Sequence, residues 1–158
     1  MFSIKKSYND HTKSRGVFCE MRIMAIDYGD AHTGVAISDR LGFGAGVAET
    51  IDSRDQDVVV ARLKDYIRDY EVEEVALGYP KNMDGSLGPR AEKSEALAAR
   101  LREETGLPVT LWDERRTTVD AYRILGDVNR RGKKGRKVVD AVAATLILEG
   151  YLAFRQRQ

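Results

Sequence analysis

From Met21 onward, short apolar runs alternate with polar segments that contain glycine. The first part of this pattern predicts β-strands, because each run is short and bounded by turn residues. The predicted strands are Arg22–Asp27, Thr33–Asp39 and Gly44–Ile51. Short glycine-bearing links favour antiparallel hairpins. The sequence therefore predicts a three-stranded antiparallel meander at the start of the folded region.

A helix is predicted after the meander. Asp52 or Ser53 can cap its first turn, and apolar side chains then recur at helical spacing along one face. These apolar positions are Val59, Leu63, Tyr66, Ile67 and Tyr70. We expect this face to lie against the sheet.

The rest of the chain alternates strands and helices. Proline at the first helical position and glycine after the last one mark the limits of the second helix. The predicted elements are strand Val72–Tyr79, helix Pro89–Gly106, strand Pro108–Glu114, a short helix from Thr117 or Thr118 to Leu125, a loop Gly126–Lys137 and a last helix Val138–Phe154. Two crossover units after a meander give an α/β fold. We expect a mixed five-stranded sheet, three strands antiparallel and then two parallel, with helices on both faces.

Composition limits the classes of protein. A length of 158 residues fits a single domain, which we place at 21–155, and the net charge of +1 excludes a general polycation. Any nucleic-acid contact must come from local clusters of charge. One cysteine excludes an intrachain disulfide and fits a cytoplasmic location, and no apolar stretch is long enough to cross a membrane.

Residues 1–20 are polar and lack periodicity. The main interpretation is a disordered N-terminal extension, or a start codon assigned too early, since Met21 can itself be an initiator. The alternative is a basic arm that binds nucleic acid, because four cationic residues lie in this segment. They are Lys5, Lys6, Lys13 and Arg15.

Three acidic residues at the ends of hydrophobic elements are the main candidates for chemistry. Asp27 ends the first strand, Glu114 ends the last strand, and Asp140 lies at the start of the last helix. Such carboxylates are costly unless something positive meets them. Oxygen ligands suit Mg²⁺ or Mn²⁺, and the N-terminal turn of a helix favours an anion. The predicted helix start at Val138 puts Asp140 in this first turn.

A strongly basic segment precedes Asp140. Six of its eight residues are cationic: Arg130, Arg131, Lys133, Lys134, Arg136 and Lys137. Such a cluster neutralises phosphates and makes binding salt-dependent, although a charge run is often only a solvated loop. Arg115, which follows the last-strand acid, and Arg90 are weaker candidates for phosphate contacts. Carboxylates beside a basic loop suggest cleavage of a nucleic-acid phosphodiester.

The segment Asp27–Asp39 reads DYGDAHTGVAISD. Gly29 and Gly34 permit a tight turn and a close approach of the backbone to a ligand. This hairpin pattern alone occurs both in nucleases and in the phosphate loops of actin-like ATPases. A chain this short lacks the second lobe with which such an ATPase encloses nucleotide.

Four later motifs decide between these classes. They are Leu77–Pro80, Asp84–Ser86, Trp112–Arg115 with Thr117 and Thr118, and Lys137–Ala144. With the first motif, this set over about 21–151 resembles the YqgF/RuvX family, the Holliday-junction-resolvase-like proteins linked to nuclease processing of pre-16S ribosomal RNA. The resemblance implies a ribonuclease H-like fold, in which Asp27, Glu114 and Asp140 converge as catalytic residues.

The resemblance also implies the chemistry. Two ions, Mg²⁺ or Mn²⁺, would be held by Asp27 as the bridging ligand, with Glu114 and Asp140 completing one shell each. The implied partner is structured precursor rRNA in the bacterial cytoplasm, on the ribosomal particle or free. Two rivals stay open: resolution of a DNA junction, which usually needs a symmetric dimer, and a non-catalytic RNA-binding assembly factor. The sequence leaves a monomer and a weak homodimer equally open.

Asp113 competes with Glu114 as the last-strand ligand. Adjacent strand residues point to opposite faces of a sheet, so we expect only one of the two to reach the metals, and the resemblance favours Glu114. Three further residues receive structural interpretations. Tyr28 and Trp112 are expected to pack in the interior, and His32 is expected to be a solvated turn residue.

Overall fold

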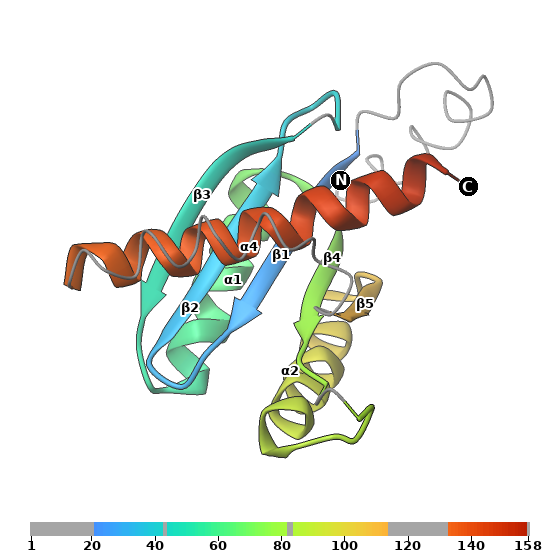
Figure 1. Cartoon of the computed structure of the whole chain (residues 1–158). Helices are drawn as coiled ribbons and strands as arrows, with labels where there is room; N and C mark the ends of the chain where they lie inside the picture. Colours follow the sequence, from blue (N-terminus) through green and yellow to red (C-terminus); the bar gives the residue numbers. More distant parts are fainter. Residues whose placement is uncertain (1–20, 43, 82–83, 114–132, 158) are drawn as a thin grey trace.

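The computed structural model describes residues 21–42, 44–81, 84–113 and 133–157, and of residues 133–139 it describes the backbone alone. A five-stranded sheet runs in the order β3-β2-β1-β4-β5 (Figure 1). Its strands are β1 (Arg22–Tyr28), β2 (His32–Ser38), β3 (Ala45–Asp52), β4 (Val72–Tyr79) and β5 (Val109–Asp113). β1, β2 and β3 pair antiparallel, whereas β4 and β5 join β1 in parallel. The predicted mixed sheet is confirmed.

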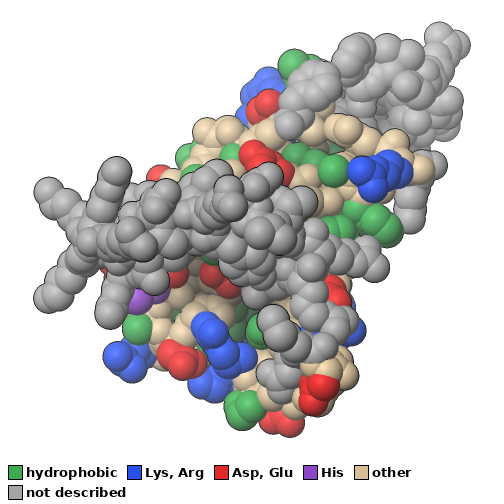
Figure 2. Space-filling model, in the orientation of Figure 1, with side chains coloured by type: hydrophobic (Ala, Val, Ile, Leu, Met, Phe, Trp, Pro, Cys, Tyr) green, Lys and Arg blue, Asp and Glu red, His purple; other side chains and the backbone are tan. Residues whose placement is uncertain are grey.

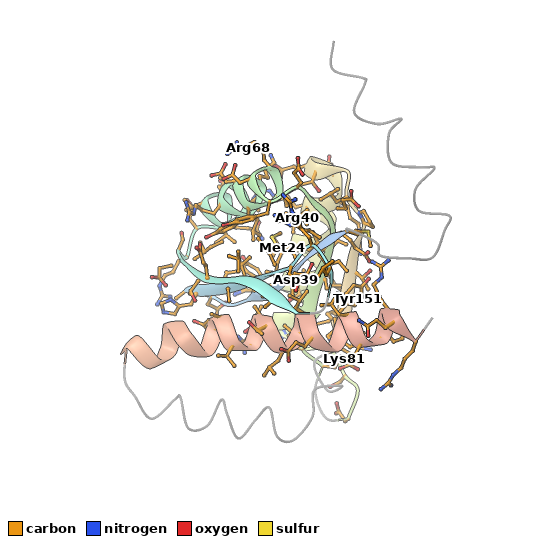
Figure 3. The ribbon with its side chains drawn as sticks, turned by 90° about the horizontal axis from the view of Figure 1, so that it is seen from above. Met24, Asp39, Arg40, Arg68, Lys81 and Tyr151 are labelled. Atoms are coloured by element: carbon orange, nitrogen blue, oxygen red, sulfur yellow. The ribbon has the colours of Figure 1, made fainter. Side chains whose placement is uncertain are left out.

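Helices cover the sheet in two separate layers. The helices are α1 (Gln56–Asp69), α2 (Pro89–Thr105) and α4 (Lys133–Gln156). Helix α4 crosses one face of the sheet, while α1 and α2 cover the other, as the view from above shows (Figure 3). Along α1, Val59, Leu63 and Tyr66 are buried, as their spacing predicts. No helix in the described part of the chain is both long and apolar enough to span a membrane.

The two faces of the sheet differ in side-chain size. Large side chains such as Met24, Ile26 and Leu77 fill the core beneath α1 and α2. The other face is built mainly from alanine, with Ala25, Ala36 and Ala76 against Ala144 and Leu148 of α4. Small side chains let a helix approach the sheet closely. The strand alternation thus places α4 near the backbone of β1 and β2.

The limits of α2 follow the prediction, but the start of α1 does not. Pro89 stands at the start of α2, and Gly106 ends it in the left-handed conformation at φ 71°. Helix α1 is capped by Asp55, whose carboxylate accepts from the Asp57 amide at 2.9 Å. The prediction of Asp52 or Ser53 as cap was wrong because β3 extends through Asp52.

The start of α4 also differs from the prediction. The helix begins at Lys133, not at Val138, so the second half of the basic segment is helical and not a loop. Asp140 comes two turns into this helix, and its first turn contains no acidic residue. The expectation that the helix dipole stabilises Asp140 from the first turn was therefore wrong, since the dipole effect falls off within one turn.

Candidate active site

Asp27 lies near the end of β1, between two glycine positions. In the β1–β2 pair it stands opposite Gly34, and on the other side Ile26 pairs with Leu77, which Gly78 follows. Asp27 alternates with Ala25 and Ile23, so its side chain is on the α4 face. Its carboxylate is half-buried. Because glycine has no side chain, Gly34 lets another part of the chain approach the sheet beside Asp27.

Asp140, in helix α4, lies close to the same part of the sheet. A Cβ added to Gly34 would lie 2.0 Å from the carbonyl oxygen of Asp140 and 3.3 Å from the Ala144 Cβ. The α4 backbone therefore crosses β2 at the residue paired with Asp27. Residues opposite each other in an antiparallel pair share a face. Asp27 and Asp140 are thus brought to one end of one face, from distant parts of the sequence.

Asp113, in β5, does not join these two acids. Trp112 packs with α4, at 5.6 Å between its ring centroid and that of Tyr151, while Leu111 packs against the core beneath α1 and α2. Asp113 alternates with Trp112, so its side chain leaves the sheet on the face away from α4. The packing expected for Trp112 is confirmed. Glu114 and Arg115 lie outside the described residues.

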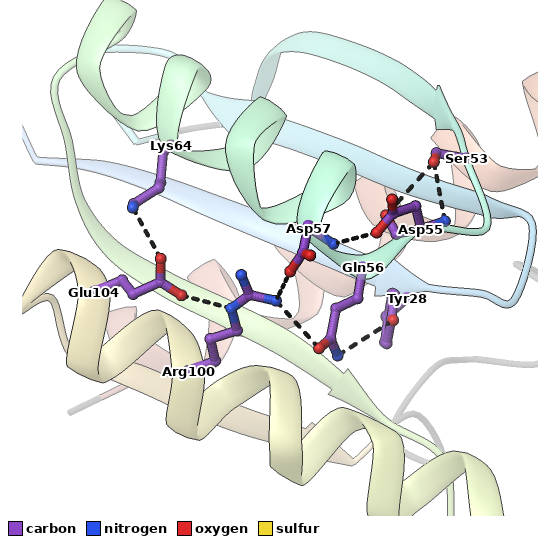
Figure 4. Close-up of polar contacts among 8 residues, drawn as sticks. All are labelled: Tyr28, Ser53, Asp55, Gln56, Asp57, Lys64, Arg100 and Glu104. Atoms are coloured by element: carbon purple, nitrogen blue, oxygen red, sulfur yellow. Dashed lines mark hydrogen bonds and ion pairs between the residues drawn. The ribbon is translucent and has the colours of Figure 1, made fainter.

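A polar network fixes the end of β1 relative to α1 and α2 (Figure 4). The Gln56 amide donates to the Tyr28 hydroxyl at 3.5 Å, and Arg100 donates to the Gln56 amide oxygen at 3.3 Å. Arg100 also pairs with Asp57 at 2.8 Å and Glu104 at 2.6 Å. The Tyr28 ring packs against the core, as predicted. The residue after Asp27 is therefore held by both helices of the opposite layer.

Further polar pairs lie near this end of the sheet. His32 begins β2, opposite Asp52 of β3, and its Nδ1 lies 2.7 Å from an Asp52 carboxylate oxygen. His32 is therefore a paired strand residue, and not the solvated turn residue that the sequence suggested. Tyr79 ends β4 and donates to Glu95 of α2. That bond, with burial, raises the pKa of Tyr79 to about 12.

Sequence reasoning missed these pairs because each depends on strand register or on helix packing. The His32–Asp52 pair carries a sequence signal, because His32 directly precedes one strand of the predicted meander and Asp52 directly follows the next. The basic segment was found but is only partly described. Arg130 and Arg131 lie outside the described residues. The structure describes only the backbone of the other four, which lies in α4: Lys133, Lys134, Arg136 and Lys137.

The donor chemistry fits a hard divalent ion. Asp27 and Asp140 supply carboxylate oxygens, which Mg²⁺ and Mn²⁺ prefer, and Mg²⁺ keeps several waters, so few protein ligands suffice. Among the residues that the structure describes, no group of three or more His, Cys, Asp or Glu side chains is arranged to hold a metal. The third predicted ligand, Glu114, lies outside that set.

The chain resembles known proteins over nearly all of the described region. Residues 21–154 match the family described as "RuvX: Holliday junction resolvase". A protein of Halothermothrix orenii named "Putative pre-16S rRNA nuclease" is 49% identical over 87% of this chain and 98% of its own length. A protein of Geobacillus kaustophilus with the same name is 51% identical over 84% of this chain and 97% of its own.

Solved structures establish the fold. T. thermophilus RuvC in complex with Holliday junction substrate has a TM-score of 0.58 at 17% identity, covering 85% of this chain and 96% of that chain. The yeast mitochondrial Holliday junction resolvase Ydc2 has a TM-score of 0.57 at 11% identity, covering 90% and 82%. The predicted ribonuclease H-like fold is confirmed. With a family match that spans 21–154 and relatives near 50% identity, the chain belongs to the RuvX family.

Proposed function

We propose that this protein is a divalent-metal-dependent nuclease that processes the 5′ end of pre-16S ribosomal RNA. One observation carries the proposal: the α4 backbone reaches β2 at Gly34, the residue paired with Asp27, and so brings Asp140 to Asp27. The name shared by relatives that are 49–51% identical supports the substrate. The geometry therefore supports the proposed chemistry, and the relatives support the proposed substrate.

Each acid has a proposed role at the scissile phosphate. Asp27 would hold the metal ions, because it lies on the central strand β1 between two glycine positions. Asp140 and Glu114 would complete the set of ligands. Asp113 is not assigned to the metals, since its side chain leaves the sheet on the other face. When bound, Mg²⁺ or Mn²⁺ supplies a water of lowered pKa and neutralises charge on the phosphate.

Hydrolysis then requires a water oxygen to form a bond to phosphorus while the bond to the leaving oxygen breaks. In this proposal the fold holds the carboxylates of Asp27 and Asp140 near the scissile phosphate, and basic residues bind the phosphodiester backbone. The basic segment at the start of α4, with Lys133, Lys134, Arg136 and Lys137, is proposed to bind the RNA backbone together with Arg130, Arg131 and Arg115. Because the substrate is ribosomal RNA, the proposed location is the cytoplasm.

Resolution of a DNA junction is the second candidate, because the matched family is described as a Holliday junction resolvase. The two activities make different demands on assembly. A junction resolvase cuts two strands symmetrically and so needs a two-fold dimer, whereas trimming one end of an RNA needs a single site. The substrate preference of the purified protein distinguishes them.

The test compares wild type and Asp27→Asn on a 5′ fragment of pre-16S rRNA, a four-way DNA junction and a single-stranded RNA. Each substrate is incubated in Mn²⁺ and in EDTA. The proposal predicts that wild type cleaves the rRNA fragment in Mn²⁺ but not in EDTA, and that Asp27→Asn does not cleave it in either. Cleavage by that variant at the wild-type rate would reject the site. RNA binding without cleavage of any substrate would favour an assembly factor.

A further inference from the structure

Three cationic side chains act electrostatically on one carboxylate beside the candidate active site. Asp30 lies in the β1–β2 turn, and Lys93 of α2 pairs with it at 2.8 Å between the ammonium and a carboxylate oxygen. Arg90, one turn earlier on α2, and Arg54, in the link before α1, also act electrostatically on Asp30. We call Arg54, Arg90 and Lys93 the turn patch. At the lower end of Figure 2, Lys and Arg side chains gather around acidic ones.

The backbone fixes the position of this patch. The Ser53 amide donates to the Ala31 carbonyl at 3.0 Å, so the link that carries Arg54 lies against the β1–β2 turn. The Lys93–Asp30 pair ties the start of α2 to the same turn. Residues from three distant segments therefore meet at one turn.

The patch carries surplus positive charge in solvent. Arg54, Arg90 and Lys93 are exposed, and all three act on the Asp30 carboxylate. The bond to Lys93 holds the pKa of Asp30 below its ordinary value, with smaller contributions from Arg90 and Arg54. The side chains of the Lys93–Asp30 pair are 59% and 63% exposed. Such pairs contribute little stability, so an incoming phosphate can compete for Lys93.

The patch also lies close enough to Asp27 to contact the same nucleic-acid strand. Asp30 follows Asp27 by three residues, so their Cα atoms are at most about 11 Å apart. Phosphates along one strand rise about 3.4 Å per nucleotide. The turn that carries Asp30 is therefore within about three nucleotide rises of Asp27. It lies toward α2, whereas the basic segment enters from α4.

We infer that the turn patch is a second phosphate-binding surface, which holds the backbone of the substrate nucleic acid within a few nucleotides of the cleavage point. This inference extends the proposed function and rests on it for the position of the scissile phosphate. Contact is with phosphates and not with bases, so it carries no sequence preference.

The test is a binding measurement in EDTA, so that it does not depend on cleavage. The variant Arg54→Gln/Arg90→Gln/Lys93→Gln is compared with the control Arg40→Gln/Arg68→Gln/Arg157→Gln. The control makes the same change in charge at the other ends of β2, α1 and α4. Affinity for the pre-16S rRNA fragment is measured by fluorescence anisotropy from about 50 to 200 mM salt, a range over which phosphate contacts have a large effect.

The patch variant is expected to bind at least about 10-fold more weakly at the lowest salt, and to lose about two units from the slope of log affinity against log salt. The control should stay within about twofold of wild type. Equal losses in both triple variants would overturn the inference, and so would an unchanged salt slope in the patch variant. Thermal unfolding checks that both variants fold.

A second variant is expected to change RNA affinity in the opposite direction. Asp30→Asn removes the carboxylate that repels phosphate and occupies Lys93. We expect it to bind RNA about threefold more tightly at low salt, because the patch gains one net positive charge. Misfolding does not tighten binding, so this result cannot come from damage to the protein. Weaker or unchanged binding by Asp30→Asn contradicts the inference, whatever the cleavage assays of Asp27→Asn give.

Discussion

The carbonyl of Asp140 lies so close to Gly34 that a Cβ there would come within 2.0 Å of its oxygen. Gly34 is also the β2 partner of Asp27. One glycine therefore sets both the depth at which α4 crosses the sheet and the approach of Asp140 to Asp27. The alanines of this face, Ala36 among them, continue the close contact along α4.

Replacing Gly34 by alanine tests this contact. The added methyl group meets backbone that cannot rotate away, so α4 must shift. We expect Gly34→Ala to lower the free energy of unfolding by about 1–3 kcal/mol and to reduce cleavage strongly. Urea denaturation measures the first effect. Gly44→Ala is the matched control, since nothing in the described part of the chain lies within 4 Å of a Cβ there. Equal stability of the two variants would refute the contact.

A buried threonine offers a prediction of the opposite sign. Thr33 is fully buried, and its hydroxyl has no hydrogen-bond partner among the residues that the structure describes. An unsatisfied buried hydroxyl is destabilising, and valine has nearly the same shape without it. We expect Thr33→Val to raise the free energy of unfolding by about 1 kcal/mol without affecting cleavage.

Thr105→Val is the control for that substitution. The Thr105 hydroxyl donates to the Leu101 carbonyl at 2.6 Å and accepts from the Leu107 amide at 3.2 Å. The same change of side chain should therefore destabilise the protein by about 1 kcal/mol. If both variants shift stability in the same direction in urea, the hydroxyl of Thr33 is not the cause.

The Tyr79–Glu95 pair predicts a loss of stability at alkaline pH. The hydrogen bond to Glu95 and burial raise the pKa of Tyr79 to about 12, against about 10 in an unfolded chain. The folded state thus keeps a proton that the unfolded state releases, and unfolding becomes easier as pH rises from 10 toward 12. Below pH 10 this contribution is fully present.

Absorbance at 295 nm against pH, compared between wild type and Tyr79→Phe, isolates this group. The difference curve should contain one tyrosine that titrates near pH 12, and the variant should lose part of the decline in stability above pH 10. A difference curve centred at pH 10 would mean that Glu95 does not hold the Tyr79 proton.

The sheet could be predicted from the sequence because its signals are local. Strand β4, Val72–Tyr79, contains the apolar run Val75–Leu77 and is closed by Pro80, and its limits match the prediction. Helix α4 shows where local signals mislead. Gly132, Gly135 and a run of cations suggested a loop up to Lys137, yet Lys and Arg are good helix formers, and the helix begins at Lys133.

The candidate site depended on contacts that no local pattern contains. Asp27 was identified from its place at the end of an apolar run, but the crossing of Asp140 over Gly34 joins residues more than a hundred positions apart. The Lys93–Asp30 pair likewise needs the packing of α2 against the β1–β2 turn. Strand alternation did give one prediction in advance, that Asp113 and its neighbour diverge, and Asp113 lies on the face away from α4.

The central claim is that acids on the α4 face, and not those on the other face, carry cleavage. The most direct measurement is the rate of Mn²⁺-dependent cleavage of the pre-16S rRNA fragment by wild type, Asp27→Asn, Asp140→Asn and Asp113→Asn. Losing a metal ligand should cost at least as much as losing a residue that orients one, which is about 10- to 100-fold. We therefore predict losses of about 100-fold or more for Asp27→Asn and Asp140→Asn, with Asp113→Asn close to wild type. A large loss in Asp113→Asn beside an active Asp27→Asn would contradict the account.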